Sequence, residues 1–453
     1  MRIVIVGCGK IGGSILNSLS RENHDIVVVD NNPAVISNVS DAYDVMGICA
    51  GGTHYKTLAE ANVQNAELFI ATTGSDELNM LSCFLAKRMG AEHTVARIRS
   101  KEYSSDNIEF IKNQLELSMV INPELVTAQT IFNILKFPSA VMSETFTQRR
   151  FEMAELVVKP QSYLDGIKLA DLRGKSAATF LIGAVLRDRR AYIPNGSFTI
   201  QGGDKIGILA APDDMQKLLK SLGILQKSAK DVMILGGSKI AQYLAEILLR
   251  SGNRVTIIER DEKRCEELCA ELSDDATIIC GDGTQHSLLE EEGIDSADAF
   301  VALTGMDEEN ILVSFCAKNR NVPKVVAKVN QDGYGEISEQ LGLECVVSPR
   351  HIIADIIVQY ARALQNTIGS AVETLYSLMN GMVEALEFNV PSDFAHVGVP
   401  IKDLKLKPEI LISGIIRGNR TIIPGGDDAL RSGDRIIVIA AGQKLCDLTD
   451  ILL

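Results

Sequence analysis

The stretch MRIVIVGCGKIGGSILNSLS (residues 1–20) decides the fold of the first part of the chain. The apolar run Ile3–Val6 stops at the hexapeptide GCGKIG (residues 7–12), which has the pattern G-x-G-x-x-G. A strand that ends at such a turn and continues into a helix is typical of a dinucleotide-binding βαβ unit. Taken alone, the hexapeptide is more often a tight glycine turn than a nucleotide site, so its context has to decide between the two.

The same pattern returns in the second half of the chain. KDVMILGGSKIAQYLAEILLRSGNRVTIIE begins at Lys230, and at one constant offset Gly236 aligns with Gly7 and Glu259 with Asp30. The segments between and after the two copies also match, IPNG with IPGG. Such self-similarity predicts a tandem duplication of two kinds of unit, N and C. We place N1, C1, N2 and C2 at residues 1–140, 141–225, 230–370 and 371–453.

Each N unit alternates short apolar strands with amphipathic stretches of helix length. In N1 the strands are expected near residues 3–6, 26–29, 45–49, 68–72, 94–98 and 119–121. Strands that are apolar on both faces have helices on both sides, which predicts an α/β fold with a Rossmann-like, doubly wound parallel sheet. Each C unit has short alternating strands around Gly, Pro and Asp turns, so we expect a small α+β domain.

The composition excludes several classes of function. With a net charge of −14, non-specific binding of nucleic acid or of an anionic membrane surface is not expected, since both need a basic face. No apolar run approaches the roughly 20 residues that span a bilayer, and the start does not have the pattern of a signal peptide. Any membrane role is therefore expected to come through a partner.

The nine cysteines are scattered, which fits reduced thiols in the cytoplasm. Cys265 and Cys269 lie four residues apart and could share a helix face, but no further ligand completes a metal site, so no metal is expected. Cys49 and Cys280 align with each other, and we expect both to be packed in the interior at strand ends.

N1 carries the stronger candidate for a nucleotide site. Gly7 permits the tight turn, Gly9 lets a pyrophosphate approach the backbone, and Gly12 lets the helix pack on the strand. Amide groups at the start of the helix would face the phosphates. Asp30 ends the second strand at the spacing where a carboxylate accepts hydrogen bonds from ribose hydroxyls, which favours NAD(H) or an adenosine nucleotide over NADP(H). A surface Asp at a strand end is the alternative.

Further candidate residues lie at the ends of the later strands. Arg97 lies within an apolar strand and is expected to contact a phosphate, with an internal ion pair as the alternative. Glu124 is expected to face either the opening of the same candidate site or solvent. Cys8 is expected to fill the tight turn as a small residue. Four small residues are expected to leave room for the base and sugar, with ordinary βα turns as the alternative: Gly52, Thr53, Thr73 and Gly74.

N2 repeats this set with substitutions. Its turn is GGSKIA, with Ser238 at the second glycine position and Ala241 at the third. The serine Cβ narrows the approach to the backbone, although its hydroxyl could donate to a phosphate. Glu259 and Lys328 stand where N1 has Asp and Arg. Two interpretations stay open: a working pocket with a different preference, or a copy that has only a structural role.

No catalytic constellation accompanies either turn. None of the six histidines has a recognisable catalytic setting, no tyrosine is followed by lysine four positions later, and no G-x-x-x-x-G-K-[ST] loop exists. A dehydrogenase needs an acid or base beside the nicotinamide and a substrate domain, for which a C unit is small. We therefore expect a nucleotide sensor that is not an enzyme. An NAD-dependent oxidoreductase of unknown substrate, or a sensor without a membrane partner, is the alternative.

Together, the duplicated turns, ATTGSDELNM (residues 71–80), LTGMDEEN (residues 303–310) and the IPNG and IPGG turns resemble the RCK/KTN family. The resemblance covers essentially the whole chain, whose duplicated length is similar to that of Trk potassium-uptake regulatory subunits. It implies a cytoplasmic regulator on the inner face of the membrane, assembled as a homotetrameric ring beneath an integral-membrane potassium transporter. Relatives bind NAD(H) or ATP and ADP in the N units, and ligand exchange changes ring shape and gating.

The resemblance also implies two sets of binding residues. At the first site, where NAD(H) is expected, they are Gly7, Cys8, Gly9, Lys10, Ile11, Asp30, Gly52, Thr53, Thr73, Gly74 and Arg97. At the second site, which would hold NAD(H), ATP or ADP, they are Gly236, Gly237, Ser238, Lys239, Ile240, Glu259, Asp282, Gly283, Thr304, Gly305 and Lys328. The departures at Ser238 and Ala241, and Asp282 opposite Gly51, leave the second ligand open.

Overall fold

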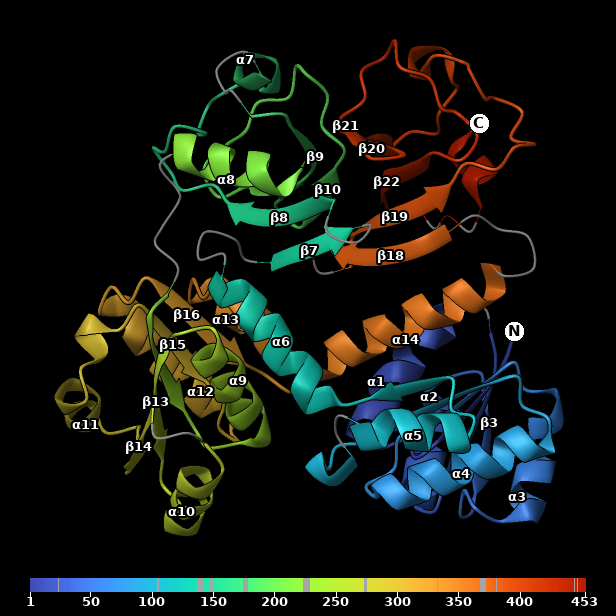
Figure 1. Ribbon diagram of the computed structural model, residues 1–453, viewed down its shortest axis with the longest axis vertical. Helices are drawn as coiled ribbons and strands as arrows, with labels where there is room; N and C mark the ends of the chain where they lie inside the picture. Colours follow the sequence, from blue (N-terminus) through green and yellow to red (C-terminus); the bar gives the residue numbers. More distant parts are fainter. Residues whose placement is uncertain are drawn as a thin grey trace.

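The chain forms four β-sheets that repeat in pairs (Figure 1). Two six-stranded sheets are parallel, and each is followed by a five-stranded antiparallel sheet. The predicted fold class, two Rossmann-like units each followed by a small α+β unit, is therefore confirmed, and we keep the names N1, C1, N2 and C2. The computed structural model describes residues 1–22, 24–103, 106–136, 142–146, 150–173, 178–222, 229–272, 275–331, 333–366, 372–379, 381–443, 445 and 447–453.

The N1 sheet has the strand order β3-β2-β1-β4-β5-β6, in which the order reverses between β1 and β4. Ligands of such sheets bind outside the carboxyl ends of the strands at this reversal. The strands are β1 (Arg2–Val6), β2 (Asp25–Asp30), β3 (Met46–Cys49), β4 (Leu68–Ala71), β5 (His93–Arg97) and β6 (Met119–Ile121). The helices are α1 (Lys10–Leu19), η1 (Ser20–Glu22), α2 (Pro33–Ala42), α3 (Tyr55–Glu60), η2 (Val63–Asn65), α4 (Asp76–Met89), η3 (Lys101–Tyr103), α5 (Asp106–Gln114) and α6 (Pro123–Lys136).

The N2 sheet repeats this arrangement in the order β14-β13-β12-β15-β16-β17. Its strands are β12 (Asp231–Leu235), β13 (Arg254–Glu259), β14 (Ala276–Cys280), β15 (Ala299–Ala302), β16 (Lys324–Lys328) and β17 (Cys345–Val347). Its helices are α9 (Lys239–Arg250), α10 (Glu262–Glu271), α11 (His286–Glu291), η4 (Ile294–Ser296), α12 (Asp307–Asn319), α13 (Gly333–Gln340) and α14 (Pro349–Asn366). The duplication found in the sequence is thus a duplication of topology.

The two antiparallel sheets lie side by side at one end of the molecule, at the top of Figure 1, and share the apolar cluster that contains Phe151, Leu209, Val383 and Ile439. C1 contains β7 (Met142–Phe146), β8 (Phe151–Val157), α7 (Leu169–Arg173), β9 (Phe180–Arg187), β10 (Arg190–Tyr192), β11 (Lys205–Ala210) and α8 (Pro212–Ser221). C2 contains β18 (Val372–Leu378), β19 (Val383–Asn389), η5 (Ile401–Asp403), β20 (Ile410–Arg417), β21 (Arg420–Ile422), β22 (Arg435–Ala441) and η6 (Leu448–Ile451).

The last helix of each N unit packs on the other N unit. Helix α6 from N1 contacts α9 of N2, and its residues Ile131 and Leu135 belong to the apolar core of N2. Helix α14 from N2 contacts α1 of N1, and Ile353 and Ile357 belong to the core of N1. Because buried apolar area is the main source of stability, this exchange ties the two N units together. Both helices also lead toward the C sheets (Figure 1).

One buried ion-pair network connects three of the units. The guanidinium of Arg362, on α14, lies 2.7 Å from the carboxylate of Glu22 in N1 and 2.9 Å from that of Glu384 in C2. The Arg362 side chain is only 9% exposed. Arg362 therefore joins α14 to both N1 and C2.

Candidate functional site

A cavity of about 600 Å³ opens at the carboxyl ends of the N1 strands, within the size range of small-molecule sites. It lies at the β1–β4 reversal, where the fold predicts a ligand. Of the residues that the sequence assigned to the first site, those lining it are Gly7, Gly9, Lys10, Ile11, Asp30, Gly52, Thr73, Gly74 and Arg97. Cys8 and Thr53 do not line it.

The three glycines of the first turn have different structural roles. Gly7 has a φ of +85°, and a Cβ there would lie 2.8 Å from the backbone nitrogen of Thr73. A Cβ on Gly12 would lie 2.1 Å from the Gly7 carbonyl oxygen. Gly9, in contrast, has no neighbour within 4 Å of its Cβ position. Folding therefore requires Gly7 and Gly12, whereas the space beside Gly9 is open to a ligand.

Asp30 holds the turn as well as facing the cavity. Its Oδ2 accepts a hydrogen bond of 2.7 Å from the backbone N–H of Cys8, and its Oδ1 accepts one of 2.9 Å from Asn32. Burial, and then the neighbouring Asp30 charge, raise the pKa of the Cys8 thiol to about 11. Cys8 thus contributes a backbone donor to the turn, and its thiol stays protonated.

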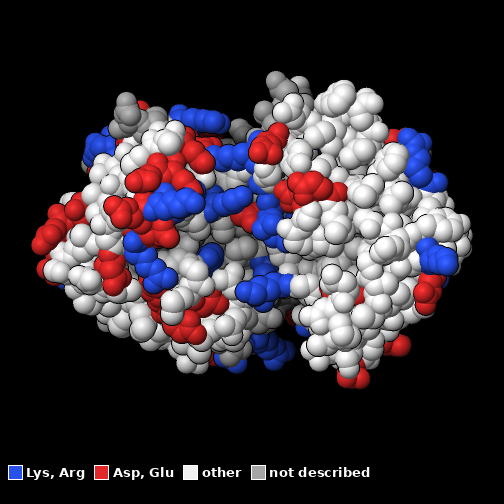
Figure 2. Space-filling model, turned by 90° about the horizontal axis from the view of Figure 1, so that it is seen from below, with Lys and Arg blue, Asp and Glu red and all other residues white. Residues whose placement is uncertain are grey.

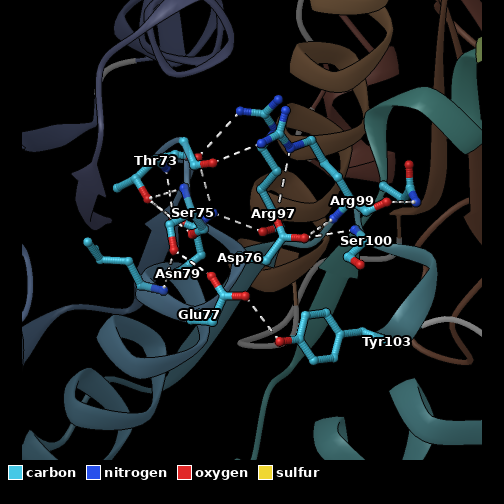
Figure 3. Close-up of polar contacts among 12 residues, drawn as sticks. Thr73, Ser75, Asp76, Glu77, Asn79, Arg97, Arg99, Ser100 and Tyr103 are labelled. Carbon is cyan, nitrogen blue, oxygen red and sulfur yellow. Dashed lines mark hydrogen bonds and ion pairs between the residues drawn. The ribbon is translucent and has the colours of Figure 1, made fainter. Parts of the chain in front are cut away.

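The loop after β4 is fixed by a buried amide (Figure 3). Asn79, on α4, accepts hydrogen bonds at Oδ1 from the Thr73 backbone N–H (2.8 Å) and hydroxyl (2.7 Å). Its Nδ2 donates to the carbonyl of Arg97 at 2.9 Å. This amide therefore sets the positions of two predicted ligand-binding residues. Our sequence reasoning missed Asn79, although the matching Asn310 in LTGMDEEN makes the same contacts in N2.

A carboxylate fixes the next loop in the same way. Asp76 Oδ2 accepts hydrogen bonds of 2.8 Å from the backbone N–H groups of Arg99 and Ser100 (Figure 3). Arg99 then donates from Nη2 to the carbonyl of Gly74 at 2.8 Å. The segment after β4, which lines the cavity, is thus joined to the segment after β5.

Two charged side chains at the first cavity have unused hydrogen-bonding atoms. The Nε of Arg97 and the Oε2 of Glu124 are buried and have no hydrogen-bond partner. Burial, followed by the charge of Arg99, lowers the pKa of Arg97, and Glu124 partly opposes this shift. An anion beside Arg97 would offset the cost of burying its guanidinium, which fits the predicted phosphate contact. Glu124 lines the cavity, so the first of its two predicted positions holds.

N2 completes the wall of the first cavity. Ile240, Asn330, Pro349 and Arg350 line it together with the N1 residues. Figure 2 shows Lys and Arg side chains gathered along the hollow between the two halves of the face it views. Our sequence reasoning missed this contribution, because the pattern of a single N unit carries no signal for which residues a neighbouring unit brings to it.

A second cavity, of about 500 Å³, lies at the matching place in N2. Among the predicted residues, Ile240 lines the first cavity instead, and Lys328 lines neither. The Nζ of Lys328 donates to the Thr304 carbonyl at 2.6 Å, and burial lowers its pKa. The predicted residues that do line the second cavity are Gly236, Gly237, Ser238, Lys239, Glu259, Asp282, Gly283, Thr304 and Gly305.

The second turn keeps the anchoring pattern of the first. Glu259 Oε2 accepts a hydrogen bond of 2.6 Å from the backbone N–H of Gly237, and its Oε1 accepts one of 2.9 Å from Asp261. The Ser238 hydroxyl oxygen accepts from the Ala241 N–H at 3.3 Å and so caps α9. The substitution that narrows the approach to the backbone therefore also stabilises the start of the helix.

An arginine on α10 distinguishes the second cavity from the first. Arg264 donates from Nε to the Gly237 carbonyl at 2.7 Å and from Nη2 to Gln242 Oε1 at 3.0 Å, and it lines the cavity. N1 has Val35 at the matching place. The second cavity thus has a fixed cation beside its turn that the first lacks.

The prediction for Cys49 and Cys280 was wrong. Both thiols are exposed. Each residue ends an edge strand, β3 or β14, so no further strand covers it on one side. We predicted burial from their positions at strand ends, because the sequence does not specify which strands lie at the edge of a sheet.

Two further features bear on function. Within the described ranges, no helix is both long and apolar enough to cross a bilayer. The same ranges contain no group of three or more His, Cys, Asp or Glu side chains placed to hold a metal ion.

The chain matches two domain families, each of them twice. The TrkA-N domain family matches residues 3–123 and 232–349, and the TrkA-C domain family matches residues 153–223 and 385–453. These matches reproduce the duplication found in the sequence.

Relatives match over the full length. A Trk system potassium uptake protein TrkA homolog of Archaeoglobus fulgidus is 32% identical over 452 residues and 100% of both chains. Trk system potassium uptake protein TrkA homolog 1 of Methanosarcina mazei is 31% identical over 456 residues and 99% of both chains.

Solved structures share the fold. The GsuK RCK domain superposes with a TM-score of 0.63 at 19% identity, covering 97% of this chain and 92% of that one. A GsuK channel bound to NAD gives a TM-score of 0.63 at 19% identity and covers 97% of this chain and 77% of that one.

Proposed function

Because the chain belongs to the TrkA family of Trk potassium uptake proteins, we propose that it regulates an integral-membrane potassium transporter from the cytoplasmic face of the membrane. The full-length match to TrkA homologues and the GsuK channel structures support this proposal. The chain would dock on its transporter as a peripheral subunit, since none of its described helices could span a bilayer.

The signal that it senses is an adenine nucleotide bound in the N units, NAD(H) in the first cavity and NAD(H), ATP or ADP in the second. One observation carries this proposal: Gly9, at the centre of the first turn, has open space beside it at a cavity that Asp30 also lines. The GsuK channel has been solved both with NAD and with ADP, which supports this class of ligand. The unused Nε of Arg97 fits the phosphates.

The mechanism is a shift in the population of N1–N2 arrangements. The first cavity has walls from both N units, with Lys10 and Arg97 from N1 and Arg350 from N2. An anionic ligand offsets the mutual repulsion of these cations and favours the arrangement in which they lie close together. Helices α6 and α14 then carry the change to the C sheets, α14 through Arg362 and Glu384.

Sensing without catalysis fits the residues around both cavities. None of the described residues that line either cavity is a histidine, the commonest general acid or base, and the carboxylates at the two turns, Asp30 and Glu259, are each held by a backbone N–H group. This composition favours ligand binding over hydride transfer to a second substrate.

We also propose that the chain works as a homo-oligomer, in the form of a homotetrameric ring. Leu81 in N1 is 49% exposed, and the matching Leu312 in N2 is 61% exposed. Exposed apolar side chains at equivalent positions of both units favour burial against further copies of the same chain. Replacing Leu81 and Leu312 by Asp should lower the mass measured by light scattering, and an unchanged mass would contradict this arrangement.

Potassium flux tests the proposed function. The transporter would be reconstituted in vesicles with the full chain, and flux measured with NAD+, NADH, ATP or ADP. We expect at least one nucleotide to change the flux, and Asp30→Asn to reduce that response while leaving assembly on the vesicles intact. Flux that is indifferent to all four would contradict the proposal, and consumption of NADH beyond one equivalent per chain would favour an oxidoreductase.

A further inference from the structure

Two thiols of N2 meet beside the second cavity. The Sγ of Cys265, on α10, lies 3.4 Å from the carbonyl oxygen of Glu259. The same carbonyl accepts a hydrogen bond of 2.8 Å from the N–H of Gly281. Cys280 directly precedes Gly281 and is paired with Glu259 in the β13–β14 register. Cys265 and Cys280 are therefore brought together at the Glu259 carbonyl, one by its thiol and the other by its place in the sheet register.

The two thiols differ in access. Cys280 is exposed, whereas the Cys265 side chain, on α10, is buried with 7% exposure. Burial is the main reason that the pKa of Cys265 is raised, and the neighbouring Cys280 thiol adds to the shift. A soluble oxidant therefore reaches Cys280 first, and Cys265 is the neighbour that can complete a disulfide.

We propose that Cys265 and Cys280 form an oxidisable pair that closes to a disulfide when the chain meets a peroxide. The Cys280 thiolate attacks one peroxide oxygen, the O–O bond breaks, and hydroxide leaves to give a sulfenic acid. Cys265 then loses its proton and attacks the Cys280 sulfur, so that the S–S bond forms and the S–O bond breaks. Hydrogen peroxide is reduced to two waters, and the two cysteines are oxidised by two electrons.

The pair is confined to N2. N1 has Cys49 at the place of Cys280 but Ile36 at the place of Cys265. Cys49 is exposed as Cys280 is, and its Sγ lies 3.9 Å from the carbonyl oxygen of Asn31. N1 therefore supplies a built-in control, a thiol in the same position without a resolving partner.

The disulfide would act on the second cavity. Arg264 directly precedes Cys265 and holds the Gly237 carbonyl, while Glu259 holds the Gly237 N–H. Drawing Cys265 toward Cys280 removes its contact with the Glu259 carbonyl and fixes α10 to the end of β14. The effect on a bound nucleotide rests on the proposed function, whereas disulfide formation does not.

Peptide mapping tests the pair directly. The full chain would be treated with hydrogen peroxide, its remaining thiols alkylated, and the non-reduced digest analysed by mass spectrometry. We expect a peptide linked through Cys265 and Cys280 that dithiothreitol removes. It should be absent from Cys265→Ser and Cys280→Ser and persist in Cys269→Ser and Cys49→Ser. Oxidation of Cys280 to sulfinic or sulfonic acid without a link, or a link to Cys269 instead, would overturn the proposal.

A second measurement tests the effect of the disulfide on nucleotide binding separately from the formation of the disulfide. Nucleotide affinity of the second cavity would be measured before and after peroxide in the Asp30→Asn chain, which weakens the first site. We expect a several-fold change that dithiothreitol reverses and that Cys280→Ser abolishes. A linked peptide without any nucleotide binding would contradict the proposed function but would still support the Cys265–Cys280 pair. A linked peptide with unchanged affinity would overturn the coupling to the second cavity.

Discussion

N1 and N2 have the same topology and the same anchored turn, yet they differ at a few positions around it: Gly9, Asp30 and Arg97 of N1 are replaced by Ser238, Glu259 and Lys328 in N2. In both units a carboxylate at the end of the second strand accepts from the turn, at 2.7 Å for Asp30 and 2.6 Å for Glu259. This bond is a requirement of the turn, whatever the ligand. Its presence in N2 therefore does not by itself show that N2 still binds a nucleotide.

The two turns differ in how tightly they are packed. In N1 the Thr72 hydroxyl donates to the Gly7 carbonyl at 2.7 Å and lies 2.8 Å from the Cβ position of Gly12. N2 has Leu303 in place of this threonine, and it accommodates Ala241 where N1 has Gly12. The replacement of this threonine thus removes one of the two close contacts that exclude a side chain at Gly12, the other being the Gly7 carbonyl that the threonine holds.

The cavities also differ in what surrounds them. The first has Arg350 and Asn330 of N2 in its wall, whereas the described lining of the second comes from N2 alone. A ligand in the first cavity therefore contacts both units, and a ligand in the second contacts one. On this basis the first cavity is the one suited to change the N1–N2 arrangement.

The largest effect is expected for the ion pairs of Arg362. Arg362→Ala leaves the carboxylates of Glu22 and Glu384 without their shared guanidinium and should cost about 3–5 kcal/mol of unfolding free energy. Lys136, the matching residue of α6, is exposed, and Lys136→Ala should cost less than about 1 kcal/mol. Denaturant unfolding of the two variants would measure both values, and equal costs would contradict this difference between α6 and α14.

Asp355, on α14, should make the stability of the folded chain depend on pH. Burial raises its pKa from 3.8 to about 6, so the favourable contribution of its protonated form is complete below pH 3.8 and is lost as the pH rises through 6. Asp355→Asn should therefore stabilise the chain above pH 7 by up to about 3 kcal/mol and have little effect near pH 4. Melting curves across this range would measure the gain.

The matching residue of α6 provides the control for that profile. Gln129 is neutral at every pH of interest, so Gln129→Asn should give the same small change throughout the range. A gain from Asp355→Asn that does not depend on pH would show that packing, and not ionisation, is responsible.

The next largest effect on stability is expected for substitutions in the two glycine turns. Gly12→Ala places a Cβ against the Gly7 carbonyl and should destabilise the chain by about 1–3 kcal/mol. The reverse change in N2, Ala241→Gly, relieves no clash and should cost about 1 kcal/mol through helix propensity. Thr72→Leu combined with Gly12→Ala should recover part of the loss, and a double variant no better than Gly12→Ala would refute the role given to Thr72.

A smaller effect, confined to binding, is expected at Arg350. Arg350→Ala removes one cation from the wall of the first cavity and should weaken nucleotide binding there about tenfold, or about 1.4 kcal/mol. Lys239→Ala, in the second cavity, should leave the first site unchanged. If Arg350→Ala bound with wild-type affinity, the first cavity would not be shared between the units.

Much of the fold could be predicted because it depends on local pattern. The expected strand near 26–29 corresponds to β2 and the strand near 119–121 to β6, since continuous apolar runs between polar turns specify buried parallel strands. The exchange of α6 and α14 could not be predicted. Ile131 and Ile357 have the spacing of any apolar helix face, which does not specify the unit that the face covers.

The candidate sites, like the fold, could be predicted where they depend on the local sequence pattern. Gly9 and Asp30 follow from the spacing of a single βαβ unit, and both line the first cavity. Arg350 comes from the other unit, so its place at the first cavity could not be derived from alignment of the two copies. Lys328, in contrast, donates to the Thr304 carbonyl as Arg97 donates to that of Thr73, so this contact does follow the alignment. Packing between units decides only the position of Arg350.

Titration of NADH into the full chain by calorimetry tests the central claim most directly. Wild type, Asp30→Ala and Glu259→Ala would be compared, with melting curves as a check that each variant is folded. We predict that Asp30→Ala weakens binding at the first site by about 1–3 kcal/mol, since a buried charged acceptor is lost, while Glu259→Ala leaves that site unchanged. Folded Asp30→Ala that binds NADH with wild-type affinity would contradict the account.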